Sequence, residues 1–177
     1  MTVGAVDVGK AAVLLFVVSI AQVTIFSRVD LLGARPDLLL VTLVAVALLR
    51  GSLYGAAGGF FAGLVVDTAT LETLGLTSLL LTLAGYWIGR YGETTGRDRA
   101  HAPFLSVAVV TVLYAAGALL LHFMIGDPAP ARTVLVDRLF PAIALNLIVT
   151  LPVYGLTRRL LRPAEWGDRA HEVRLLG

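Results

Sequence analysis

The side chains that could take part in chemistry are few in this chain of 177 residues, and they lie far apart. The three histidines, His101, His122 and His171, fall on different sides or at different depths of the apolar segments described below, so the sequence predicts no shared metal site. Asp67 ends one apolar segment and Asn146 lies in the middle of another. A proton relay or an ion site in a membrane needs polar companions at one depth, and few are present.

Known catalytic patterns are missing from the sequence. It contains no H-E-x-x-H, no G-x-S-x-G and no P-loop, and its lack of cysteine excludes thiolate ligands and disulfides. We therefore predict a protein that is not an enzyme and that uses no cofactor and no metal. A transporter remains an open alternative, because glycine- or proline-interrupted helices often mark a substrate pocket.

The composition indicates a membrane protein. Hydrophobic residues make up 58% of the chain and charged residues 15%, whereas a soluble domain carries about 25% charged residues. The net charge of +2 is too small to suggest binding of nucleic acid. Only helices or closed barrels satisfy the backbone in lipid. The apolar runs are long and do not alternate strictly with polar residues, so they predict helices.

The apolar runs predict a single domain of six membrane-spanning helices over residues 1–162, followed by a short cytoplasmic tail, 163–177. An arginine at the centre of a span is costly, so we expect a tight helical hairpin that turns at Arg50 and Gly51. Five or four spans are the alternatives, if this hairpin only dips into the membrane. Pro152 is expected to kink the last helix. The predicted spans are 11–26, the two arms of 38–66, 74–90, 103–125 and 139–157.

Basic residues predict the orientation of these spans. Ten of the fourteen lysines and arginines fall at the N-terminus, in the second and fourth connections and in the tail, and four fall in the opposite connections. Because basic residues favour the cytoplasmic side, we expect a multi-pass membrane protein with both termini in the cytoplasm. Arg158, Arg159 and Arg162 are expected to anchor the last span to anionic headgroups.

Small residues recur at every fourth position of the segment GSLYGAAGGFFAGLVVD. Residues four apart share one helix face, so these glycines form a groove that lets another helix approach closely. The partner helix belongs either to this chain or to another protein. Three roles are open for Asp67: it faces water, it caps the following helix, or it pairs with an arginine. Asn146 is expected to hydrogen-bond between helices. The predicted packing or partner-binding residues are Gly51, Gly55, Gly59, Gly63, Asp67 and Asn146.

Three stretches of the chain together resemble the rod shape-determining protein MreD family: RPDLLL at 35–40, LLRGSLYGAAGGFFAGLVVD at 48–67 and LGLTSLLLTLAGYWIGR at 74–90. In that family a Pro-Asp opens the second span, an Arg-Gly turn follows it, and a glycine-rich third helix ends in an aspartate. The resemblance covers residues 35–90 well and the rest only in the layout of spans. The turn TATLET after Asp67 departs from the usual glycine-rich sequence.

The resemblance implies a non-enzymatic scaffold subunit of the bacterial rod complex, or elongasome. Such proteins associate with MreC, a single-span protein, and through it with the RodA glycosyltransferase and a penicillin-binding transpeptidase, in lateral peptidoglycan synthesis that maintains cell shape. The family is similar in fold to the substrate-binding subunits of energy-coupling-factor transporters, so a vitamin-binding subunit is the alternative. The first span lacks the Ala-x-x-x-Ala spacing through which such subunits dock.

Overall fold

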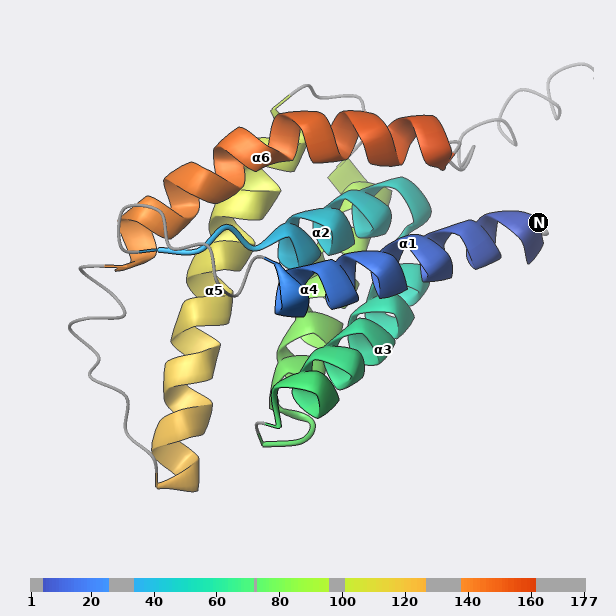
Figure 1. Cartoon of the computed structure of the whole chain (residues 1–177). Coiled ribbons are helices and arrows are strands. Elements are labelled where there is room, and N and C mark those ends of the chain that lie inside the picture. Colours follow the sequence, from blue (N-terminus) through green and yellow to red (C-terminus); the bar gives the residue numbers. More distant parts are fainter. Residues whose placement is uncertain (1–4, 26–33, 72, 96–100, 127–137, 162–177) are drawn as a thin grey trace, which may run out of the picture.

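The computed structural model of the chain is all-helical and describes residues 5–25, 34–71, 73–95, 101–126 and 138–161. Figure 1 shows the arrangement of its helices. Each predicted apolar segment corresponds to one helix, and the structure extends most of them by a few polar residues. The helices are α1 (Ala5–Thr24), α2 (Leu38–Arg50), α3 (Ser52–Thr70), α4 (Leu76–Thr95), α5 (Ala102–Ile125) and α6 (Leu139–Leu160). The predicted tail, 163–177, lies outside the described residues.

Helix α2 forms the centre of the bundle. Every residue from Leu39 to Arg50 is buried, and α2 contacts each of the other five helices. A helix that is apolar on all sides gains most when it is enclosed. Its 13 residues extend for about 20 Å, which is less than the hydrocarbon thickness of about 30 Å. The first arm of the predicted hairpin is therefore a core helix, shielded from lipid by its neighbours.

Three helices of the described chain are long and apolar enough to cross a membrane: 7–24 within α1, Ala102–Ile125 and Leu139–Leu160. With its overall composition, this makes the chain a membrane protein. The sequence predicted six spans. The other three helices do not meet this criterion by themselves. Helix α2 is too short. Glycines and hydroxyl residues lower the hydropathy of α3 and α4, and α4 also contains Arg90 and Glu93.

The two ends of the bundle differ. We call them the Arg50 end, where α1, α3 and α5 begin and α2, α4 and α6 finish, and the Asp67 end, where the opposite termini lie. In Figure 1 the helices spread apart towards the Asp67 end, so that α5 finishes well away from α3. The buried residues of α5 all lie in its first half, between Ala102 and Thr111. The second half of α5 therefore stands at the margin of the bundle.

Two backbone breaks were predicted from residue type. Gly51 joins α2 directly to α3 with φ of 95°, a conformation that favours glycine, so the hairpin turn lies where the sequence predicted it. Pro152 lies inside α6, which remains helical on both sides of it. Figure 1 shows that α6 is curved, as expected for a helix that lacks one backbone hydrogen bond.

Candidate functional site

The glycines of α3 lie against the backbone of α4. A Cβ atom added at Gly55 would overlap the carbonyl group of Gly85, and one at Gly59 would overlap that of Leu81. At Gly63 the overlap would be with the Cα of Ser78. We call this contact the glycine seam. The groove predicted for a helix of this chain or of another protein thus holds α4, so an external helix has no access to it.

Gly51 and its neighbours close the seam at the Arg50 end. Gly89 of α4 lies against Gly51 and Ser52. The Glu93 carboxylate accepts hydrogen bonds from the Ser52 N–H at 2.7 Å and from the Ser52 Oγ at 3.0 Å. Burial, which opposes ionisation, is outweighed by these two bonds and by Arg90 nearby, so the pKa of Glu93 lies below its usual range. Sequence reasoning missed this contact, although Glu93 is one of few acids at this end.

Asp67 connects the far end of α3 to the beginning of α4. Its buried carboxylate accepts hydrogen bonds from the backbone N–H groups of Gly75, Thr77 and Ser78, at 2.9, 3.1 and 3.2 Å. The first N–H groups of a helix have no partner inside the helix, and negative charge is favourable there. Of the three roles considered for Asp67, the structure shows the cap of the following helix.

Asn146 of α6 links three elements at the Asp67 end. Its Oδ1 accepts a hydrogen bond from the Asp37 N–H at 2.8 Å, and its Nδ2 donates to the Thr111 Oγ1 at 3.1 Å. Gln22 of α1 holds the same turn, because its amide accepts from the Leu38 N–H and donates to the Pro36 carbonyl. Side chains from α1 and α6 thus fix the start of the central helix.

Charged groups also meet at the Arg50 end, where sequence reasoning saw only basic residues. The guanidinium of Arg50 is buried and its Nη2 lies 3.2 Å from the Asp7 Oδ2. Apart from this ion pair, no acceptor among the described residues forms a well-aligned hydrogen bond with the Nη2 or Nε atom of Arg50. The sequence did contain a signal for this pair. Asp7 is an acid just before the first apolar run, and the predicted topology places it on the same side of the membrane as Arg50.

A cavity of about 400 Å³, the Asp37 cavity, opens at the Asp67 end. It is bordered by α1, α3, α4, α5 and the segment before α2. Asp37 is half-buried, and desolvation raises the pKa of its carboxyl although the N–H groups of Leu40 and Leu39 oppose this shift. Arg35 supplies a positive charge at the surface. The polar lining consists of Gln22, Arg35, Asp37, Thr70, Thr77 and Tyr114.

This lining is suited to binding. The exposed guanidinium of Arg35 can pair with an acidic group or a C=O group of a peptide or a small polar molecule. The Gln22 amide and the Thr70 hydroxyl already have hydrogen-bond partners within the chain. Across the described ranges, no three His, Cys, Asp or Glu side chains gather closely enough to hold a metal ion. Of the predicted residues, only Asp67 and Asn146 lie near this cavity, through their contacts with Thr77 and Asp37; the glycines lie in the seam.

Comparison with known protein families gives a match over most of the chain. The model of the rod shape-determining protein MreD family matches residues 9–163, which include all six helices nearly completely and the whole Asp37 cavity. Neither the curated proteins nor the solved structures contain a match to the chain. The family match extends over most of the sequence, far beyond the stretch 35–90 that carried the resemblance. The chain therefore belongs to the MreD family of rod shape-determining membrane proteins.

Proposed function

We propose that this MreD-family protein is a non-enzymatic scaffold subunit of the bacterial rod complex. It binds an MreC-like single-span protein and, within the complex, associates with RodA and a penicillin-binding transpeptidase to support lateral peptidoglycan synthesis. The family match supports a role in the determination of rod shape. The observation that carries the binding role is the Asp37 cavity, an open recess whose lining includes the exposed Arg35 and the half-buried Asp37.

We propose further that all six helices cross or enter the plasma membrane, with both termini in the cytoplasm. The distribution of charge supports this orientation. Among the described residues, the Arg50 end carries five cations and two acids, whereas the Asp67 end carries two of each. An excess of lysine and arginine favours the cytoplasmic side. In this orientation the Asp37 cavity opens to the outside of the cell, on the side of peptidoglycan synthesis.

The partner would bind in the Asp37 cavity through the segment that follows its membrane span. Close packing of α3 on α4 leaves the glycine seam to shape the bundle from within. In the cavity, the Gln22 amide is already engaged with the turn before α2, whereas Arg35 is exposed at the rim. Arg35 is therefore the side chain best placed to pair with an acidic group of the partner.

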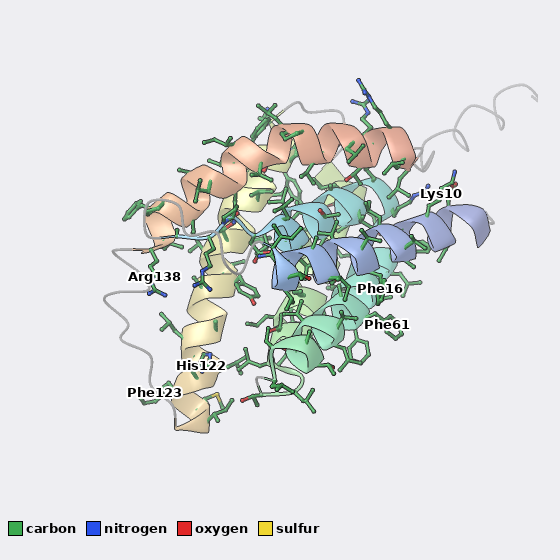
Figure 2. All side chains as sticks on the ribbon, in the orientation of Figure 1. Lys10, Phe16, Phe61, His122, Phe123 and Arg138 are labelled. Carbon is green, nitrogen blue, oxygen red and sulfur yellow. The ribbon has the colours of Figure 1, made fainter. Side chains whose placement is uncertain are left out.

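Co-purification from native membranes tests this proposal. Arg35→Gln should lower recovery of the MreC-like protein about fivefold, the loss expected for one partly exposed ion pair. Arg138→Gln is the matched control, because Arg138 is exposed at the same end but lies outside the cavity, at the start of α6 (Figure 2). In cells, depletion should round rod-shaped cells, and the control variant should restore their shape. Equal recovery with both variants would place the partner elsewhere.

One observation favours a second candidate, the substrate-binding subunit of an energy-coupling-factor vitamin transporter. The volume of the Asp37 cavity, about 400 Å³, lies within the range of small-molecule pockets. The similarity in fold to those subunits stays a prediction. The two candidates differ in a simple phenotype: a scaffold subunit affects cell shape on depletion, whereas a transporter subunit affects vitamin uptake in cells that keep their shape. The family match favours the scaffold.

A further inference from the structure

The turn before α2 is held from two sides. The Gln22 amide of α1 donates to the Pro36 carbonyl at 3.2 Å and accepts from the Leu38 N–H at 3.0 Å. From α6, the Asn146 Oδ1 atom accepts from the Asp37 N–H at 2.8 Å. Because the backbone is fixed on both sides of Asp37, this residue is in position before a ligand arrives, which lowers the cost of binding.

The Asp37 carboxylate lines the Asp37 cavity without a positive partner. Its Oδ1 atom accepts a hydrogen bond from the Leu40 N–H at 2.9 Å, as the N-cap of α2. Among the described residues, the ion pairs join other side chains, and none of them includes Asp37. Burial raises the pKa of this carboxyl, since desolvation disfavours the charged form. The negative charge is therefore only partly compensated by the described part of the chain.

Arg35 lines the same cavity but does not pair with Asp37. Arg35 precedes Pro36, and a residue before proline favours extended backbone. Positions two apart in an extended segment are about 6.6 Å from each other along the chain and point to the same side. The exposed Arg35 and the half-buried Asp37 are thus two separate points of contact on one cavity, of opposite charge.

A ligand that fills the cavity removes water from Asp37. Loss of hydration is costly for a charge that has no partner, whereas a well-placed opposite charge offsets that cost. Peptide N–H groups supply only partial charges, and the start of α2 already supplies those. A ligand with a cation at this point therefore binds better than one that is neutral or acidic there.

We propose that Asp37 is a second contact of the cavity, which pairs with a lysine or arginine of the bound segment. The segment then carries both signs of charge, with its acid at Arg35 and its base at Asp37. A segment that places an acid at Asp37 is rejected by like charge. This inference rests on the proposed function, because it takes the segment that follows the span of the MreC-like protein as the ligand. It adds the charge pattern by which that segment is selected.

Asp37→Asn tests this contact in the co-purification from native membranes. Asparagine caps a helix as well as aspartate does, so the variant removes the charge and keeps the start of α2, and its unfolding midpoint in SDS should not change. Recovery of the MreC-like protein should fall about tenfold, more than for Arg35→Gln, because the loss of a desolvated ion pair costs more than that of an exposed one. Asp37→Ser also keeps a capping oxygen and serves if Asp37→Asn does not fold. Glu93→Gln is the matched control, since it removes one acid at the other end of the bundle.

A double-mutant cycle identifies the cation of the partner. Each lysine and arginine in the segment that follows the partner's span is replaced by glutamine, and recovery is measured with the parent and with Asp37→Asn. One replacement should lower recovery about tenfold with the parent and less than about twofold with Asp37→Asn, because both changes remove the same interaction. The proposal is wrong if no replacement is coupled to Asp37→Asn in this way, or if Asp37→Asn recovers as much partner as Glu93→Gln. In the latter case, a loss with Arg35→Gln leaves the proposed function standing, whereas equal recovery with all three variants refutes that function too.

Discussion

Substitution of Gly59 by leucine is the most direct test of the glycine seam. Gly59 faces the backbone of α4, where a Cβ would overlap the carbonyl group of Leu81 and approach the Thr82 nitrogen to 2.9 Å. Backbone atoms within a helix cannot rotate away, so α3 and α4 must separate by roughly 1 Å to reach normal contact distances. The same movement loosens the neighbouring contacts at Gly55 and Gly63.

The cost follows from the contacts that are lost. A gap of this size forfeits up to half of the attraction of each atom pair, and if the seam holds on the order of 30 pairs at 0.1 to 0.2 kcal/mol each, the loss is about 2 kcal/mol. Strain from overpacking adds about 1 to 3 kcal/mol. We therefore expect Gly59→Leu to destabilise the bundle by about 3 to 5 kcal/mol.

The assay is unfolding of the purified protein in mixed micelles by titration with SDS, followed by far-ultraviolet circular dichroism. Gly155→Leu is the control, because a Cβ at Gly155 meets nothing within 4 Å; it should unfold within about 0.5 kcal/mol of the parent. If Gly59→Leu unfolds at the same SDS fraction as Gly155→Leu, close backbone contact between α3 and α4 does not stabilise the bundle, and the reasoning is refuted.

Three further predictions use the same purified protein, and a fourth uses intact cells. Asp67→Ala should destabilise the protein by about 2 kcal/mol in the SDS titration, because three N–H groups at the start of α4 lose their acceptor. Asn146→Leu should cost about 1 kcal/mol in that titration, as for other hydrogen bonds between membrane helices, and an unchanged midpoint would contradict the link to Asp37. Because the pKa of Glu93 is lowered from 4.5 in the folded state, the unfolded state binds more protons, so the contribution of Glu93 is complete above about pH 4.5 and is lost as the pH falls through the lower folded value. Unfolding midpoints at neutral and acid pH should show this loss in the parent and not in Glu93→Gln. For topology, a membrane-impermeant thiol reagent added to intact cells should label Thr70→Cys and spare Arg97→Cys in this cysteine-free chain, and labelling of the second variant would reverse the proposed orientation.

Local sequence determined the helices and their breaks. The apolar runs, the glycine at position 51 and the proline at position 152 act on the backbone within a few residues, so the hairpin turn and the bend of α6 were predictable. Helix existence follows from the need to satisfy the backbone in an apolar environment. The spacing of Gly55, Gly59 and Gly63 likewise predicted close approach of a helix, because that spacing is a property of one helix face.

Only the tertiary structure decided which elements meet. Nothing in the spacing of glycines distinguishes α4 from a helix of another protein, since both present a backbone of the same shape. The pairing of Asp7 with Arg50 and of Gln22 with the turn before α2 joins residues that are 43 and about 15 positions apart. Such contacts depend on the packing of the other five helices around α2. The Asp37 cavity arises in the same way, because it is formed where neighbouring helices do not fill the space between them.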